Sequence, residues 1–140
     1  MRSLREALAL LVVALAPAAL AIALHPQLSD RRRAGLEEGA VLLAEVRDWH
    51  ADTLWIDARS DADFSRDHIP GAVHLDEAAF DRDLGAVLAA WTPGRRVVVY
   101  CSTTSCGTSR DVAARLRKAG LGDVYFLHGG WEAWQSAARN

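Results

Sequence analysis

Residues 96–100, Arg-Val-Val-Val-Tyr, constrain the fold more than any other segment of the sequence. The three consecutive valines are β-branched and apolar, which favours a strand, and no polar residue alternates with them. Strands of this kind are buried on both faces and are typical of parallel sheets. Parallel strands need long crossover connections, which are usually helices. The segment therefore predicts an α/β domain.

The rest of the chain shows the expected alternation from residue 40 onward. Between residues 80 and 91, for example, apolar side chains recur at the three- and four-residue spacing of one helix face. We therefore predict a mainly parallel central sheet of about five strands flanked by helices, with ligands bound beyond the carboxyl ends of the strands. Strands are expected at residues 41–43, 53–56, 73–75, 96–100 and 124–127, and helices at residues 45–49, 80–91, 112–119 and from Gly129 onward.

The N-terminus differs in kind from this domain. Residues 7–24 are 18 consecutive apolar residues, which as a helix would span about 27 Å, close to the hydrocarbon thickness of a bilayer. We interpret this segment as a single-pass membrane anchor, that is, one hydrophobic transmembrane-type helix before the domain. A cleaved signal peptide and a buried soluble helix are the alternatives.

This interpretation divides the chain into residues 1–33, the anchor with a basic linker, and a domain of residues 34–140. It predicts a location in a membrane of the bacterial inner-membrane type, with a secreted or periplasmic protein as the alternative if the segment is cleaved. Arginines lie on both sides of the apolar segment, so the positive-inside rule leaves the orientation open.

Charge and cysteine content exclude several classes of function. Residues 34–140 carry 16 acidic and 11 basic side chains, and this negative charge argues against nucleic acid as a partner. The chain has two cysteines, too few for a small disulfide-stabilised scaffold. No cysteine or histidine spacing matches a zinc site. Neither a metal ion nor an organic cofactor is therefore predicted.

Both cysteines lie in the loop that follows residues 96–100. The loop consists of small, mostly hydroxylated residues, so it can turn its backbone N–H groups toward Cys101. We expect Thr108 or Ser109 to cap the helix that follows, and the positive end of that helix dipole then points at the loop. Arg110 would add a fixed positive charge. The pKa of the Cys101 thiol is then expected to fall, which gives a reactive thiolate, whereas the alternative is an inert buried cysteine. The expected loop consists of Ser102, Thr103, Thr104, Ser105, Cys106, Gly107, Thr108, Ser109 and Arg110.

Five short motifs, in a fixed order between about residues 40 and 138, resemble the rhodanese-like (sulfurtransferase) domain family. The resemblance implies a rhodanese-like fold in which Cys101 is the catalytic nucleophile, without a cofactor. The motifs are Trp55-Ile56-Asp57-Ala58-Arg59, Asp63-Phe64, His68-Ile69-Pro70-Gly71-Ala72, Val98-Val99-Tyr100-Cys101 and Gly129-Gly130-Trp131-Glu132-Ala133-Trp134.

We interpret the motif residues outside the loop as structural. Asp57 and Arg59 lie two residues apart at a strand end, so their side chains point to the same side and can fix adjacent loops by charge-assisted hydrogen bonds. His68 is expected to fix its own loop. Trp131 and Trp134 are expected to pack against the core or against the wall of the site.

The loop departs from simple rhodaneses, in which an Arg follows the nucleophile after five residues. Here Arg110 follows Cys101 after nine residues, and a second thiol, Cys106, stands where the shorter loop has Gly. Cys106 would either act as a resolving thiol, which attacks a persulfide on Cys101, releases the outer sulfur in reduced form and leaves a disulfide, or be a small loop residue without a chemical role. Because the loop sets substrate preference, the donor and the acceptor stay open.

The resemblance implies a single-domain sulfurtransferase that acts through a Cys101 persulfide. The donor would be a small sulfur-containing anion such as thiosulfate, or a persulfide, and the acceptor a thiophile such as cyanide or a protein thiol. Two other functions are open: a thiol–disulfide redox or redox-sensing module using Cys101 and Cys106, and a non-catalytic binding module at the membrane. A phosphatase relative is disfavoured because residue 107, where that chemistry needs an Arg, is Gly.

Overall fold

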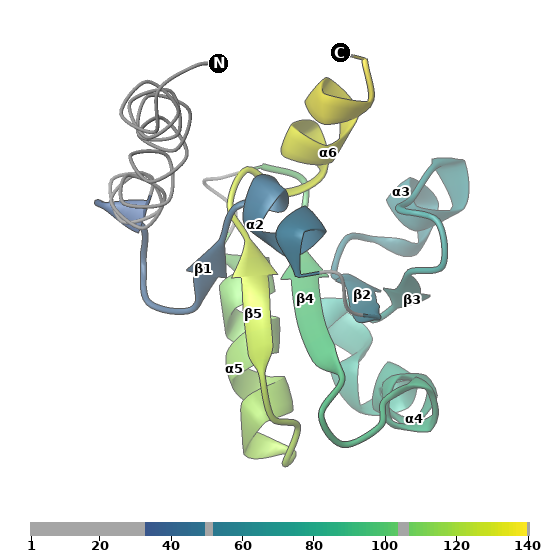
Figure 1. Cartoon of the computed structure of the whole chain (residues 1–140). Helices are drawn as coiled ribbons and strands as arrows, with labels where there is room; N and C mark the ends of the chain where they lie inside the picture. The colour runs from purple at the N-terminus through teal and green to yellow at the C-terminus, as the bar shows by residue number, and fades with distance from the viewer. Residues whose placement is uncertain (1–32, 50–51, 104–106, 140) are drawn as a thin grey trace, which may run out of the picture. The chain divides into compact units, whose positions relative to one another are not determined.

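The computed structural model describes residues 33–49, 52–103 and 107–139 (Figure 1). Residues 36–140 form one compact unit in which strands and helices alternate, as predicted. Its elements are β1 (Ala40–Val41), α2 (Leu43–Asp48), β2 (Thr53–Asp57), α3 (Asp61–Arg66), β3 (Val73–His74), the 3₁₀ helix η1 (Glu77–Ala79), α4 (Phe80–Ala90), β4 (Arg96–Tyr100), α5 (Thr108–Lys118), β5 (Val124–Leu127) and α6 (Gly130–Ala138).

The five strands form one parallel sheet in the order β1-β5-β4-β2-β3. The central strand β4 pairs with β2 over its whole length, from Thr53 opposite Arg96 to Asp57 opposite Tyr100. The prediction of a mainly parallel sheet of about five strands is confirmed. Because Cys101 directly follows β4, it lies in the middle of the carboxyl edge of the sheet, where open α/β sheets bind ligands.

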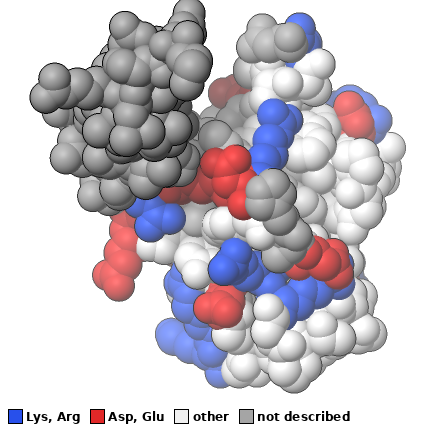
Figure 2. All heavy atoms as spheres, in the orientation of Figure 1, with Lys and Arg blue, Asp and Glu red and all other residues white. Residues whose placement is uncertain are grey.

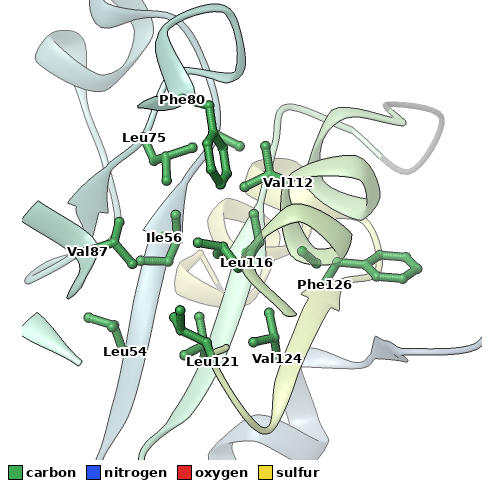
Figure 3. Packing of buried hydrophobic residues seen from close by; sticks show 14 residues of the cluster. Leu54, Ile56, Leu75, Phe80, Val87, Val112, Leu116, Leu121, Val124 and Phe126 are labelled. Carbon is green, nitrogen blue, oxygen red and sulfur yellow. The ribbon is translucent and has the colours of Figure 1, made fainter. Parts of the chain in front are cut away.

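Helices α4 and α5 cover one face of the sheet (Figure 3). Every second side chain of β2 and β4 points into this layer, as the alternation along a strand requires. The layer is apolar, which explains why these strand positions carry aliphatic residues. Its buried side chains include Leu54, Ile56, Leu75, Val87, Val97, Val99, Val112 and Leu116.

Helices α2 and α6 pack on the other face, which is richer in aromatic side chains. Val98 and Tyr100 point to this side. The ring centroids of Trp55 and Trp134 are 5.7 Å apart in an edge-on contact, and those of Tyr100 and Trp131 are 6.2 Å apart. Trp131 and Trp134 therefore pack against the core, as predicted.

Three local features differ from the sequence-based expectation. Helix α3 was not expected, although the hydroxyl of Ser60 caps it by accepting a hydrogen bond from the Asp63 N–H at 3.3 Å, and a Ser-x-x-Asp pattern is a helix-start signal. Leu43 was expected in a strand but begins α2, because the Glu45 carboxylate accepts the Leu42 N–H at 3.0 Å. The third feature is η1, a short helical turn directly before α4.

The membrane anchor expected at residues 7–24 lies outside the described residues. Among the described residues, no helix has the length and the apolar character needed to cross a bilayer.

Candidate active site

Cys101 follows β4 directly and is 2% exposed. Its neighbours form a pocket of about 280 Å³. The walls of this pocket come from the segments after β2 and β3 and from the start of α5, so they meet at the carboxyl edge of the sheet. The lining residues are Ala58, Arg59, Ser60, Asp63, Asp76, Glu77, Ala78, Cys101, Ser102 and Thr108.

The sulfur of Cys101 lies between its own loop and the first turn of α5. Sγ is 3.5 Å from the carbonyl oxygen of Thr103 and 3.4 Å from the hydroxyl oxygen of Ser109, which is buried. Ser109 is the second residue of α5, so the sulfur lies beside the N-terminus of that helix. Backbone dipoles at a helix N-terminus stabilise a thiolate, and the Ser109 hydroxyl can donate a hydrogen bond to it.

The predicted cap of α5 is wrong. The N-cap residue is Gly107, without a side-chain cap. The hydroxyl of Thr108 donates to Oε2 of Glu77 at 2.8 Å instead, and Ser109 faces Cys101. The expected loop residues Thr104, Ser105 and Cys106 lie outside the described residues.

Helix α6 holds the loop from its other side. The N–H of Trp131 donates to the carbonyl oxygen of Cys101 at 2.7 Å, and the N–H of Glu132 donates to that of Ser102 at 3.2 Å. Gly130 has a positive φ of 51°, and a Cβ there would collide with the Cys101 carbonyl oxygen. The second glycine of the Gly-Gly motif is therefore needed so that α6 can approach the loop closely.

Asp57 and Arg59 form a buried ion pair at the pocket. Nη2 and Nε of Arg59 donate to the two carboxylate oxygens of Asp57 at 2.6 and 3.0 Å. Nη2 also donates to the Asp67 carbonyl oxygen at 2.7 Å, which ties down the segment after α3. Burial disfavours the charged guanidinium, but the hydrogen bonds and the charge of Asp57 outweigh it and raise the pKa of Arg59.

The hydroxyl of Tyr100 extends this network. It donates to Oδ2 of Asp57 at 2.7 Å and accepts the N–H of Ile69 at 3.1 Å. Burial first, and then the hydrogen bond to Asp57, raise the pKa of Tyr100 above its ordinary value. The phenol therefore stays protonated and links β4 to the loop around Ile69. Sequence reasoning missed Tyr100 because its position in a buried strand suggested packing alone.

His68 belongs to a stack of rings outside the pocket lining. The Nδ1 atom of His68 lies 2.9 Å from the carbonyl oxygen of Phe64, and the ring centroids of His68 and Phe64 are 4.0 Å apart. Phe64 also stacks on His74, whose Nε2 is 2.8 Å from the carbonyl oxygen of Arg59. These contacts place His68 where it can hold the end of α3.

Arg110 lies outside the pocket lining and is bound to an acid. Its Nη1 donates to Oε2 of Glu37 at 3.0 Å, and its Nε lies 3.7 Å from Oδ1 of Asp111. On the face seen in Figure 2, acidic and basic side chains of the described residues likewise lie next to each other. The positive charge that the sequence suggested for the loop is therefore engaged with Glu37 and Asp111.

Three acids line the pocket: Asp63, which the sequence analysis interpreted as a structural motif residue, and Asp76 and Glu77, which sequence reasoning did not select. Asp76 and Glu77 follow β3, so their place after a strand was a usable signal, because the carboxyl ends of parallel strands meet at one edge. These acids do not form a metal centre. Among residues 33–49, 52–103 and 107–139, no group of three or more His, Cys, Asp or Glu could hold a metal ion.

Known sequences resemble this chain over the whole domain. A sequence model of the rhodanese-like domain matches residues 36–137. A protein named thiosulfate sulfurtransferase GlpE from Pseudomonas savastanoi pv. phaseolicola is 30% identical over 107 residues, which cover 76% of this chain and 83% of the relative. A protein of the same name from Pseudomonas fluorescens (strain Pf0-1) is 38% identical over 82 residues, or 58% and 69% of the two chains.

Solved structures show the same fold. A protein from Bacillus halodurans superposes with a TM-score of 0.61 at 20% identity and covers 81% of this chain and 82% of its own. A thiosulfate sulfurtransferase from Pseudomonas aeruginosa gives 0.59 at 23% identity and covers 73% of this chain and 19% of its own. The family model spans most of the chain, and the observed sheet and motif contacts agree with it. The chain therefore belongs to the rhodanese-like domain family.

Proposed function

We propose that this protein is a sulfurtransferase in which Cys101 carries sulfane sulfur as a persulfide. The observation that supports this most is the place of the Cys101 thiol, which lies at the centre of the carboxyl edge of the sheet, beside the N-terminus of α5, and borders a pocket. The relatives named thiosulfate sulfurtransferase support the same chemistry.

The proposed reaction has two half-reactions. In the first, the Cys101 thiolate attacks the outer sulfur of thiosulfate. A bond forms between Sγ and that sulfur, the bond to the sulfonate sulfur breaks, and the electron pair leaves with sulfite; from a persulfide donor, a thiolate leaves instead. In the second, an acceptor such as cyanide or a thiol attacks the outer sulfur, and Cys101 leaves as a thiolate. No external oxidant or reductant is consumed.

The surrounding residues would assist without forming bonds to sulfur. The N-terminus of α5 and the hydroxyl of Ser109 stabilise the anionic sulfur of Cys101. The N–H groups of Trp131 and Glu132 hold the loop carbonyls, so the loop keeps its shape during transfer. Asp57 and Arg59 are positioning residues, because their charges are paired with each other.

The test is mass spectrometry of the protein after incubation with thiosulfate, together with a thiosulfate:cyanide transfer assay. We expect the wild type to gain one sulfur atom and Cys101→Ser to gain none and to lose transfer. A Cys101→Ser protein that still gains sulfur at this loop would contradict the proposal.

The resolving role of Cys106 is a separate proposal that rests on sequence alone. With Cys106→Ser, ordinary sulfurtransferase chemistry predicts unchanged transfer, whereas the two-thiol route predicts its loss. A Cys101–Cys106 disulfide trapped by acid quench, in protein that never forms a persulfide, would favour the thiol–disulfide redox function instead.

We also propose that residues 7–24 hold the protein at a membrane, because their length and apolar character suit a bilayer. The full chain should stay in the membrane fraction after alkaline extraction, and the double variant Leu11→Arg, Leu15→Arg should release it, since a charge at the centre of a membrane helix is costly. An N-terminus of the mature protein at residue 22, at residue 24 or further along the chain would show a cleaved signal instead, because the small residues Ala21 and Ala23 precede the first two positions.

A further inference from the structure

The pocket beside Cys101 carries more negative than positive charge. Its lining holds the three carboxylates noted above and one cation, Arg59. Arg59 is bound on both carboxylate oxygens of Asp57, which is fully buried, so the two charges cancel inside the protein. An entering molecule therefore meets a net acidic wall.

Two of the acids are held by groups without charge. Oδ1 of Asp76 accepts the backbone N–H of Ala78 at 2.9 Å. Oε2 of Glu77 accepts the hydroxyl of Thr108 at 2.8 Å. Neutral donors fix the direction of a carboxylate and leave its charge in place. These hydrogen bonds therefore orient Asp76 and Glu77 without bringing a positive charge to the pocket.

The third acid and the loop do not reverse this balance. Arg66 lies 3.1 Å from Oδ1 of Asp63 and offsets part of its charge. Residues 102–109, which follow Cys101, contain no charged side chain. Arg110, the next cation along the chain, binds Glu37. The loop therefore supplies no basic side chain to the pocket.

Two further arginines near the acidic wall have acidic partners of their own. Nε of Arg82 lies 2.6 Å from Asp83. Arg115 donates to the backbone carbonyl of Glu77, and its Nη2 lies 3.6 Å from Asp81. Each of these cations is shared with a carboxylate outside the pocket lining, and Arg82 interacts with Asp76 less strongly than with Asp83 and Asp61. The two arginines therefore offset only part of the charge of the wall.

We infer that the pocket selects sulfur substrates by charge: it favours thiols and persulfides that carry a positive substituent and disfavours anions such as thiosulfate. This inference rests on the proposed sulfurtransferase function and names its substrate class. Thiosulfate carries two negative charges and would approach the thiolate past the acidic wall. The N-terminus of α5 offers only about half a positive charge, which the thiolate itself uses. Like charges that face each other weaken encounter and binding.

The favoured half-reactions balance without a co-reactant. The Cys101 thiolate attacks the outer sulfur of a protonated persulfide R–S–SH. The new bond joins Sγ to that sulfur, the old S–S bond breaks, R–S⁻ leaves, and the proton stays on the transferred sulfur. In the return step a thiolate R′–S⁻ attacks this outer sulfur, and the Cys101 thiolate leaves. A positive group on R or R′ lowers the energy of approach to the acidic wall.

A matched pair of charged thiol reagents tests the electrostatics without any sulfur transfer. In a Cys106→Ser background, Cys101 is modified with trimethylammonioethyl methanethiosulfonate, which is cationic, or with sulfonatoethyl methanethiosulfonate, which is anionic. Each rate is divided by the rate of the same reagent with free β-mercaptoethanol, which corrects for the intrinsic reactivity of the reagent. We expect the cationic reagent to react about tenfold faster than the anionic one at low ionic strength, and the ratio to fall in high salt. A ratio near one, or below one, would overturn the inference.

Substitutions locate the cause of the preference. The double variant Asp76→Asn, Glu77→Gln should reduce the ratio to about twofold, because both acids lose their charge and keep their shape. Asp52→Asn is the matched control: Asp52 is 78% exposed, binds Arg95 and directly precedes β2, at the end of the strand away from the pocket lining, so the ratio should stay unchanged. A double variant with the wild-type ratio, or an equal loss in Asp52→Asn, would contradict the assignment.

Substrate kinetics then connect the pocket to the reaction. The double variant should form the Cys101 persulfide from thiosulfate about fivefold faster than the wild type, and its persulfide should be discharged more slowly by cysteamine, a cationic thiol. If the reagent ratio holds and no donor persulfidates Cys101, the sulfurtransferase function is wrong. If Cys101 is persulfidated but the rate ratio of the two charged reagents is near one, the sulfurtransferase function is supported and the selection of substrates by charge is wrong.

Discussion

Asp57 and Glu77 are both carboxylates close to Cys101, yet their surroundings are opposite. Asp57 is fully buried and accepts hydrogen bonds from the Arg59 guanidinium and the Tyr100 hydroxyl. Glu77 borders the pocket and accepts one from the neutral hydroxyl of Thr108. The first carboxylate is neutralised by its partners, whereas the second keeps its charge toward the pocket.

This difference follows from solvation. A buried carboxylate without a partner is strongly destabilising, so Asp57 needs Arg59, and the pair then fixes the segments that surround the pocket. A carboxylate beside water keeps its hydration and needs no cation. The same functional group therefore stabilises the fold at one position and can influence the choice of substrate at the other.

The largest effect on stability is expected from Asp57→Ala. It leaves the buried Arg59 charge and the Tyr100 hydroxyl without their acceptor, which should lower the free energy of unfolding by about 3–5 kcal/mol. Urea denaturation measures the change. Asp52→Ala is the control, because Asp52 also binds an arginine, Arg95 at 2.8 Å, but is 78% exposed; its loss should be about 0–1 kcal/mol. Equal losses of stability in the two variants would contradict the expectation that the buried carboxylate contributes more to stability than the exposed one.

A second large effect is expected from Gly130→Ala. The added Cβ would collide with the Cys101 carbonyl oxygen, so α6 or the loop must move, at a cost of about 2 kcal/mol or more, and sulfur transfer should fall with it. Gly85→Ala is the control: Gly85 lies inside α4, where an added Cβ would meet open space, and alanine there should stabilise the protein by about 0.5–1 kcal/mol. Unchanged transfer in Gly130→Ala would contradict the proposed approach of α6.

Tyr100→Phe should have an intermediate effect of about 1–3 kcal/mol, because the buried Ile69 N–H and Asp57 each lose a hydrogen bond. The effect should depend on pH. The pKa of Tyr100 is raised in the folded state from its ordinary value of 10.0, so the phenol stabilises the fold fully below pH 10.0 and less as pH rises toward the folded-state pKa. The stability difference between wild type and variant should therefore shrink above pH 10.0. A constant difference in denaturation from pH 7 to pH 11 would contradict this.

Glu77→Gln should have the smallest effect on stability, within about 0.5 kcal/mol. The amide oxygen of Gln can still accept the Thr108 hydroxyl, and no buried charge loses a partner. The variant should nevertheless change the ratio of the charged thiol reagents at Cys101. A loss of stability comparable to that of Asp57→Ala would contradict this prediction and would show that Glu77, like Asp57, stabilises the fold.

Much of the fold could be predicted from local sequence. The three valines of β4 indicated a doubly buried parallel strand, and apolar spacing located α4 and α5. Helix α3 could not be found from apolar spacing, because it contains no buried residue; its signal was the cap at Ser60. The N-cap of α5 was misplaced because Thr108 and Ser109 bond to distant partners, Glu77 and Cys101.

By itself the sequence determined the alternation of strands and helices, the family, and the place of Cys101 at the end of the central strand. These depend on periodicity and on short motifs, which act between near neighbours. Only the tertiary structure decided which charges meet at Cys101. Asp63 follows β2, Asp76 and Glu77 follow β3, and Arg110 is engaged with Glu37. Charge in a pocket depends on distance and burial, and both are set when separate segments come together at one edge of the sheet.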